Sequence, residues 1–368
     1  MIAALKRLTD NILGRGEAGC TVPVFDGVLR PNNALDEAVQ LAAVSEPGDM
    51  AADGARLLVS SGKRLLALDP ANTGKAEDVL TARETISALA AQDGVLAVAE
   101  GGTTVRLVGG AHDGRAWTSA SGKPFICVNA LALDGDRLII SDASRHNGPD
   151  AWQRDLMEKR ASGRVIAIDL PTGRETVLAD GLAHPFGVIA QGDHVVCAES
   201  WRHRVLRLRA GHAPEVPLDN LPGYPSRLAS AGGGGLWLTV FACRTQLVEF
   251  VLRERKYREV MMATIAPEFW PAPQVRPPHS FLEPLQGGGI KQMGVLKPWA
   301  PPRSYGLVIR LAADGRITSA LHSRVDGRNH GIVAAAEAGG ELFCLSAGAD
   351  AVLKAPLQRG GERDHDSR

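Results

Sequence analysis

The sequence predicts an all-β fold, a six-bladed β-propeller with a partly helical cap insertion. A hairpin-like pattern, made of an apolar run, a polar turn and a second apolar run, recurs six times. Its copies start at residues 57, 95, 138, 195, 236 and 342. Most intervals between copies are close to the ~40–50 residues of a four-stranded propeller blade. The two longer intervals contain polar or proline-rich insertions, so the count of six blades holds.

Each hairpin supplies the two middle strands of a blade, and flanking runs supply the other two. Short apolar runs precede the hairpins, as in NALAL at 129–133 and FGVIA at 186–190. Polar TG and DG turns and a further strand follow them, as in RVIAIDLPTGRETVLADGL. The inner strands are apolar throughout because neighbouring blades cover both faces of each sheet. We expect an N-terminal strand around CTVPVFDGV, at 20–28, to complete the last blade.

Two insertions interrupt the repeat. The third interval contains SRHNGPDAWQRDLMEKRAS, a polar loop in which we expect a short helix. The longest interval contains residues 252–304, where TQLVEFVLRERKYREVMMATI, which begins shortly before, has apolar residues at helical spacing. We interpret 252–304 as a cap or lid within a propeller that covers 20–358. An N-terminal extension at 1–19 and a disordered tail at 359–368 complete the expected organisation.

Charge and cysteine usage give few hints of partners. Lys plus Arg and Asp plus Glu both number 41, so no net field favours nucleic acid or an anionic membrane. The 5 cysteines are scattered, three of them in apolar strand runs, and form no CxxC or Cys/His cluster. We interpret them as reduced core residues. The expected partner is a small-molecule substrate, and the oligomeric state is left open.

The N-terminus contains no recognisable secretion signal. Lys6, Arg7 and Asp10 interrupt its apolar residues, which a signal peptide would keep continuous. No apolar run reaches the length of about 18 residues that a membrane span requires. We therefore expect a cytoplasmic protein without a membrane span.

Three segments together resemble the strictosidine synthase-like family. HPFGVIAQGDHVVCAESWRHRVLRL is followed by NLPGYPSRL, and SYGLVIRLAADGRITSALHSRVDGRNHGIV is similar to that family's last blades. The resemblance spans roughly residues 46–357 and implies a six-bladed propeller of the superfamily that includes gluconolactonase-type proteins and paraoxonases. In the hairpin, we interpret Glu199 as an arginine partner and Trp201 as packing between blades, so that this stretch identifies the fold.

Side chains from all six blades are expected to converge where the innermost strands begin. That position lies eight or nine residues before most of the hairpins. Counting back gives a polar, mixed ring of candidate site residues: Asp49, Ser87, Asn129, Phe186 with Gly187, Ser226 with Arg227, and His330. We expect Asn129, Ser87, Phe186 and Ser226 to bind substrate.

The resemblance allows the ring residues to be compared with the metal ligands of related proteins. In lactonase-like members of the superfamily, a divalent cation, often calcium, is held by a carboxylate, by asparagines and by an Asp-Asn pair. Asp49 and Asn129 match the first two, but Ser226 and Arg227 stand at the pair's position and Phe186 replaces another asparagine. Calcium prefers six to eight oxygen ligands, and a guanidinium offers none. We expect either no cofactor or a single Ca²⁺ on Asp49 and Asn129.

Arg227 and His330 are the predicted catalytic residues. In one hypothesis, Arg227 replaces the positive charge of the metal and either pairs with Asp49 or binds an anionic substrate group. In the alternative hypothesis, Arg227 caps a blade. In plant strictosidine synthases, the segment similar to GRNHGIV contains a glutamate that serves as the base, and here His330 lies near that position. A histidine is suited to general-base catalysis, although it is equally suited to a structural hydrogen bond.

Weaker candidates lie in the loops. His184 precedes a proline, His279 lies in the insertion, and Trp270 and Trp299 either line an entrance or attach the cap.

Three functions remain open from the sequence. The first is hydrolysis of a lactone or ester in the central channel, with His330 as base and Arg227 or a metal stabilising the oxyanion. The second is a non-catalytic ligand-binding or scaffold propeller. The third is amine-aldehyde condensation of the strictosidine synthase type, for which Asp49 is the ring acid that would recognise an amine.

Overall fold

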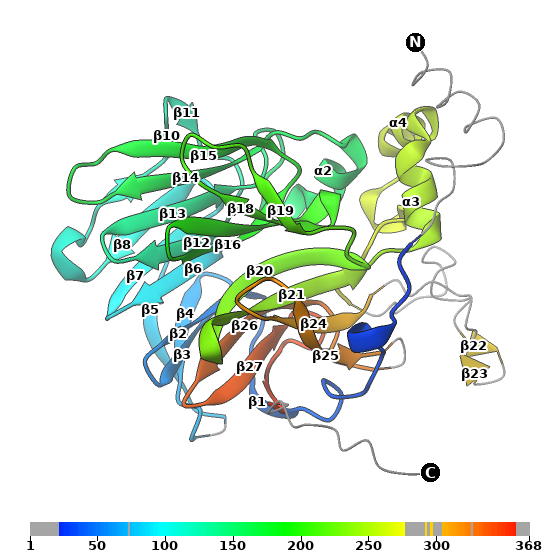
Figure 1. Cartoon of the computed structure of the whole chain (residues 1–368), viewed down its shortest axis with the longest axis horizontal. Helices are drawn as coiled ribbons and strands as arrows, with labels where there is room; N and C mark the ends of the chain where they lie inside the picture. The colour runs from blue at the N-terminus through cyan, green and yellow to red at the C-terminus, as the bar shows by residue number, and fades with distance from the viewer. Residues whose placement is uncertain are drawn as a thin grey trace.

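Six four-stranded antiparallel sheets form the body of the molecule, which confirms the predicted six-bladed β-propeller (Figure 1). The computed structural model describes residues 22–72, 74–276, 304–324 and 327–357, together with the backbone of 291–292 and 295–296. The innermost strands, β2, β6, β12, β16, β20 and β26, each contact the next, and β26 contacts β2, so the ring closes.

The first three blades follow one another directly along the chain. Blade one consists of β2 (Pro47–Asp53), β3 (Arg56–Ser61), β4 (Arg64–Leu68) and β5 (Ala76–Thr81). Blade two consists of β6 (Ile86–Gln92), β7 (Val95–Glu100), β8 (Thr104–Val108) and β9 (Ala116–Trp117). Blade three consists of β12 (Val128–Asp134), β13 (Arg137–Asp142), β14 (Gly163–Asp169) and β15 (Glu175–Leu182). A small hairpin of β10 (Ser119–Ala120) and β11 (Lys123–Pro124) separates blades two and three.

The last three blades include the insertion and the closure of the ring. Blade four consists of β16 (Pro185–Gln191), β17 (His194–Glu199), β18 (Arg204–Leu208) and β19 (Glu215–Leu218). Blade five consists of β20 (Gly223–Ala231), β21 (Gly235–Cys243), β24 (Gly306–Leu311) and β25 (Ile317–Ser323). Blade six consists of β26 (Ile332–Ala338), β27 (Glu341–Ser346), β28 (Ala351–Ala355) and β1 (Val39–Ala43).

The strand that closes the ring lies later in the sequence than predicted. Residues 22–28 form no strand, and residues 20–21 lie outside the described residues. Instead β1 pairs with β28, so that both ends of the propeller meet in one blade (Figure 1). The VQLAA sequence of β1 buries Leu41 and Ala42, whereas Val24 in the predicted segment is exposed. Burial of apolar side chains against blade six therefore selects the later segment.

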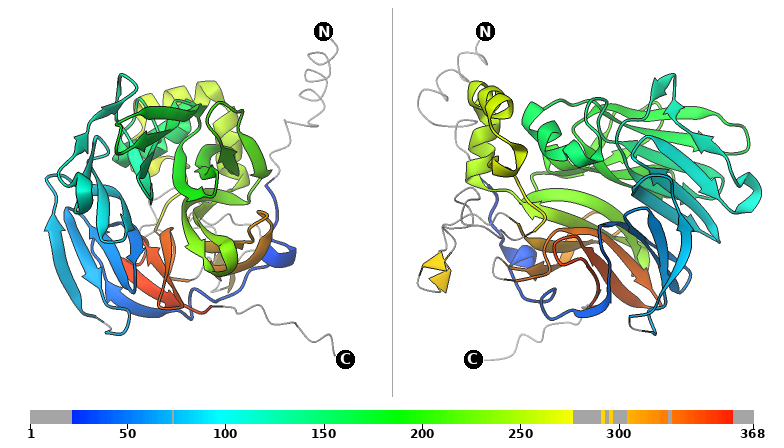
Figure 2. Two further views of the ribbon diagram at one scale, coloured as in Figure 1. Left: turned by 60° about the vertical axis from the view of Figure 1, so that its left-hand side comes forward. Right: turned by 180° about the vertical axis from the view of Figure 1, so that it is seen from behind.

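The three α-helices of the described residues lie on one side of the propeller (Figure 2). Helix α2 (Trp152–Glu158) lies in the insertion between β13 and β14, as the sequence predicts. Helices α3 (Gln246–Arg253) and α4 (Arg255–Thr264) follow β21, so the helical insertion begins six residues before the predicted boundary at 252. Thr245 caps α3 by accepting a hydrogen bond from the Val248 amide, which fixes the start of the helix.

Shorter elements complete the described chain. The 3₁₀ turns are η2 (Gly27–Leu29), η3 (Gly110–His112), η4 (Pro149–Ala151), η5 (Ser200–Arg202), η6 (Gly232–Gly234) and η7 (Pro267–Phe269). A two-stranded ribbon of β22 (Lys291–Gln292) and β23 (Val295–Leu296) lies in the cap insertion. The predicted extension at 1–19 and tail at 359–368 lie outside the described residues. Cys127, Cys197, Cys243 and Cys344 are free and buried, as expected of core residues.

Candidate functional site in the central channel

A break in pairing register recurs at the start of every innermost strand. A β-bulge re-aims the side chain that it leaves unpaired, and bulges are frequent next to active sites. The residues at these breaks include Asp49 in β2, Ser87 in β6, Asn129 in β12, Phe186 in β16, Arg227 in β20 and Val333 in β26. The structure therefore places the predicted ring residues of five blades at equivalent positions around the channel.

His330 is not the ring residue of the sixth blade. The register break in β26 falls at Val333, three residues later. The His330 ring is 1% exposed, with Nδ1 2.8 Å from the Ser304 hydroxyl and Nε2 2.6 Å from the Arg324 carbonyl oxygen. Because both ring nitrogens have protein partners and His330 does not line the cavity described below, the geometry gives no basis for its predicted role as general base.

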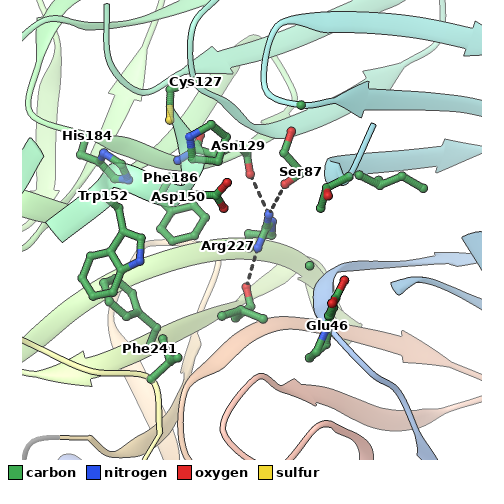
Figure 3. A pocket seen from close by; sticks show the side chains of 18 of the residues that line it. Glu46, Ser87, Cys127, Asn129, Asp150, Trp152, His184, Phe186, Arg227 and Phe241 are labelled. Carbon is green, nitrogen blue, oxygen red and sulfur yellow. Dashed lines mark hydrogen bonds between the residues drawn. The ribbon is translucent and has the colours of Figure 1, made fainter. Parts of the chain in front are cut away.

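A cavity of about 430 Å³ lies at the end of the channel where the innermost strands begin (Figure 3). Four predicted residues line it: Ser87, Asn129, Phe186 and Arg227. Aromatic rings that the sequence analysis did not place here form much of its wall, namely Trp152, Trp201 and Phe241. This volume and this mixture of aromatic walls with a few polar groups are typical of a small-molecule site.

Arg227 forms the floor of this cavity and ties together five blades. Its guanidinium donates to the Ser87 and Asn129 carbonyl oxygens, both at 2.8 Å, and to the Val333 carbonyl oxygen at 3.2 Å (Figure 3). Its Nε atom lies 2.9 Å from Asp49 Oδ1, so the predicted ion pair is present. The Phe186 ring packs on the guanidinium, with 5.0 Å from Cζ to the ring centroid. The charge is thus already engaged by protein groups.

The donor groups near Asp49 do not fit the calcium site of the lactonase-like pattern. Asp49 faces Arg227, and its carboxylate oxygens also accept hydrogen bonds from the Met50 and Leu89 amides. The Ser226 hydroxyl bonds to Thr239 instead of facing the cavity. A cation placed between Asp49 and Asn129 would meet the fixed positive charge of Arg227. Among the described residues, no group of three or more His, Cys, Asp or Glu side chains is arranged to hold a metal.

Asn129 is a buried polar group of the cavity whose amide has no partner among the described residues. It is 5% exposed, and neither Oδ1 nor Nδ2 has a hydrogen-bond partner within the part of the chain that the structure describes. A buried amide without partners is costly, so it marks a position where a ligand supplies the missing bonds. Ser87 differs because its hydroxyl donates to the Val128 carbonyl oxygen at 2.7 Å.

His184 and Asp155 form a buried pair at the cavity wall. His184 Nδ1 lies 3.3 Å from Asp155 Oδ2, and the side chains are 3% and 1% exposed. Asp155 also accepts hydrogen bonds from Ser144, Asn147 and Trp201. Burial raises the pKa of Asp155, but the hydrogen bond and charge of His184 and the hydrogen bonds from Ser144 and Trp201 outweigh it, so its pKa lies below the usual value.

The pair fixes the orientation of the imidazole. A carboxylate at Nδ1 favours the tautomer with the proton on Nδ1, which leaves the Nε2 lone pair available. No hydrogen bond to Nε2 comes from the described residues, and His184 lines the cavity. Its ring stacks on Trp201 at 4.2 Å between centroids, and its backbone has φ of 56°, a left-handed conformation that is rare outside glycine. Strained residues of this kind cluster at functional sites.

The signature hairpin contributes to both the framework and the site. Glu199 accepts hydrogen bonds from Arg202 and Arg204, which confirms its predicted pairing with arginine. Trp201, however, lines the cavity and donates from Nε1 to Asp155 at 2.8 Å. The interpretation that this stretch identifies only the fold was therefore wrong for Trp201.

The structure describes one of the three candidates in the cap, Trp270. Trp270 is 0% exposed and donates to the Ile265 carbonyl oxygen, so it attaches the cap and does not line the cavity. His279 and Trp299 lie outside the described residues.

Comparison with known proteins shows which family part of this chain is similar to. The model of the family described as strictosidine synthase matches residues 129–210, a segment that contains Asn129, Asp155, His184 and Trp201. Over this segment the chain is similar to strictosidine synthase. The resemblance predicted from the sequence is thus confirmed.

Curated relatives of this chain match it over only part of their own length. Adipocyte plasma membrane-associated protein of Mus musculus is 30% identical over 34% of this chain and 32% of its own. The Bos taurus protein of the same name is 27% identical, with 60% of each chain covered. Strictosidine synthase-like 13 of Arabidopsis thaliana is 25% identical over 39% of this chain and 37% of its own. The chain therefore spans between about a third and 60% of these relatives.

Solved structures support the propeller fold. A gluconolactonase from Xanthomonas campestris has a TM-score of 0.52 at 16% identity, covering 92% of this chain and 96% of its own. A luciferin-regenerating enzyme has a TM-score of 0.51 at 11% identity, covering 86% and 94%. The fold is thus similar to that of these two propellers. Within the described ranges, no helix is long and apolar enough to cross a membrane.

Proposed function

We propose that the protein hydrolyses a small lactone or ester in the central cavity, with His184 as the general base. The observation that carries this proposal is the Asp155-oriented imidazole at the wall of a cavity whose one buried, unpaired amide among the described residues is Asn129. A base and a hydrogen-bond donor at one cavity are the groups that acyl transfer to water requires.

The proposed reaction begins with a water molecule between His184 and the substrate carbonyl carbon. His184 Nε2 removes a proton from water as the water oxygen attacks, and the carbonyl π electrons move to oxygen. The Asn129 Nδ2–H group donates to the resulting oxyanion. When the tetrahedral intermediate collapses, the C–O bond to the alcohol breaks and the imidazolium returns its proton to the leaving oxygen. Asp155 stabilises the imidazolium and holds its tautomer, which makes it a positioning residue.

The aromatic wall limits the substrate class. Trp152 and Phe186 both contact Phe241 edge to face, at 5.4 and 5.9 Å between centroids. A substrate with a flat apolar group gains more from these rings than a polyhydroxylated sugar lactone would. Arg227 is held by Asp49 and by backbone carbonyls, so a carboxylate-bearing substrate has no free cation at the cavity floor.

The test is hydrolysis of a panel of aryl esters and aromatic or aliphatic lactones by the wild type and variants. We expect His184→Gln to lower kcat on the order of 100-fold or more, the range of general-base catalysis. Asp155→Asn should also lower kcat with little change in KM, because it disturbs imidazole orientation and not the aromatic wall. His212→Gln, an exposed histidine, is the matched control.

The outcomes separate the alternatives. Hydrolysis that persists in a folded His184→Gln protein but is lost in His330→Gln would overturn the assignment of the base. Saturable binding of an aromatic lactone without turnover in the wild type would indicate a ligand-binding propeller instead. Turnover only when an amine and an aldehyde are supplied together would favour condensation.

A further inference from the structure

A second cavity, of about 380 Å³, lies on the other side of Trp201. It is bounded by the end of α2, the turn η5 and helix α3. Helices α2 and α3 lie on the same side of the propeller (Figure 1). Part of its wall is apolar, with Leu156, Ala183, Trp201 and Leu252. Trp201 also lines the central cavity, so one indole separates two spaces.

The rest of this wall is rich in cations: Lys159, Arg160, Arg202 and Arg253. Two of them are neutralised, because Arg160 lies 3.2 Å from a Glu158 carboxylate oxygen and Arg202 lies 2.7 Å from Glu199. Lys159 and Arg253 form no ion pair with a carboxylate of the described residues. The cavity therefore has two cations whose charge is not compensated.

Glu249 also lines this cavity, but its negative charge does not compensate the charges of Lys159 and Arg253. It lies 3.2 Å from Arg244 Nε and 3.4 Å from His203 Nε2. Although burial opposes it, these partners lower the pKa of Glu249 to about 2, so it is ionised and already paired. Burial also lowers the pKa of the neighbouring His203, which favours a neutral imidazole.

Lys159 is an exposed residue that lies near other cations. It caps the C-terminus of α2 in a left-handed conformation with φ of 56°. Partial burial lowers its pKa, and the charges of Arg258 and Arg253 lower it further against the opposite effect of Glu249. An anion between Lys159 and Arg253 would relieve this repulsion, whereas a neutral or cationic molecule would not.

We propose that this cavity is a second binding site, for a small organic anion. Its carboxylate or phosphate group binds Lys159 and Arg253, and its apolar part packs on Trp201 and Leu252. The site is separate from the proposed hydrolytic centre, and its occupancy does not depend on hydrolysis. It adds a ligand class, organic anions, that the central cavity with its engaged Arg227 is not suited to bind.

The test is isothermal titration calorimetry of the full-length protein with phenyl phosphate, with benzyl alcohol as the neutral analogue. We expect saturable, salt-sensitive binding of phenyl phosphate that Lys159→Met/Arg253→Met weakens about tenfold or more, since hydrogen bonds to charged groups are stronger than those between neutral groups. Lys256→Met/Arg255→Met removes the same charges from exposed positions of α4 and should leave binding unchanged.

Three results would overturn the proposal. The first is no saturable binding by the wild type, and the second is equal binding of benzyl alcohol. The third is loss of binding in Asn129→Leu but not in Lys159→Met/Arg253→Met, which would place the ligand in the central cavity. Lys159 is exposed at the helix end, so the single variant Lys159→Gln keeps the test valid if the double variant is unstable.

Discussion

Arg227 and Asp49 form a buried ion pair across the propeller axis, with 2.9 Å between Nε and Oδ1. The residues are 8% and 2% exposed. They lie on β20 and β2, strands separated in the ring by β26, so the pair links non-adjacent blades. Burial raises the pKa of Asp49 and lowers that of Arg227, while each partner's charge acts in the opposite direction. The pair closes the channel with two opposite charges that compensate each other.

Removing the arginine should leave Asp49 as an uncompensated buried charge. We expect Arg227→Met to lower the free energy of unfolding by about 3–5 kcal/mol, the usual cost of breaking a buried pair. Arg255→Met, which breaks an exposed pair with Glu259, should cost less than about 1 kcal/mol. Urea denaturation measures both values. Adding Asp49→Asn to Arg227→Met should recover part of the loss, and a purely additive double variant would contradict this coupling.

The same pair makes a prediction about metal. Because Arg227 supplies a positive charge beside Asp49, we expect EDTA to leave the melting temperature unchanged and added Ca²⁺ not to raise it. Differential scanning calorimetry with and without each reagent provides the measurement. One tightly bound calcium per chain by elemental analysis, together with destabilisation by EDTA, would show that the donor groups rearrange around a metal.

The sequence alone predicts the propeller fold because the strands of its repeat are apolar and are buried by neighbouring blades. It also located the ring, since counting back from each hairpin found Ser87, Asn129 and Arg227 at their register breaks. The count fails at the sixth blade, where the break falls at Val333 and not at His330. A bulge inserts an unpaired residue, and pattern spacing alone does not reveal where that residue falls.

Counting back from the hairpins could not predict the His184–Asp155 pair. Asp155 belongs to the insertion between β13 and β14, so 29 residues separate it from His184 in the sequence. Only the packing of α2 against the channel mouth brings the two together. The available signal was the unusual length of the third interval, which marked an insertion of expected helical structure next to the channel.

Asn129 allows a test that separates binding from stability. Because its amide has no partner among the described residues, we expect Asn129→Leu to raise the free energy of unfolding, or leave it unchanged, by relieving a penalty of about 1–3 kcal/mol. The same variant should abolish turnover of the esters. Asn147→Leu is the matched control, because Asn147 donates to Asp155 and Glu158 at 3.1 and 3.0 Å. It should destabilise the fold, and an Asn129→Leu protein that is equally destabilised would contradict the assignment.

His322 predicts how stability depends on pH. Its ring is 0% exposed, Nε2 has no partner within the described ranges, and burial lowers its pKa to about 4. Between pH 4 and the usual histidine pKa of about 6.5, the unfolded chain binds more protons than the folded one, so stability falls as the pH is lowered. The predicted loss of stability is on the order of 3 kcal/mol across this window, and it levels off below pH 4.

Urea unfolding of the wild type and of His322→Gln at a series of pH values measures this loss. We expect a flatter profile for His322→Gln but not for the exposed control His212→Gln, and an equally steep profile in His322→Gln would assign the dependence to other groups.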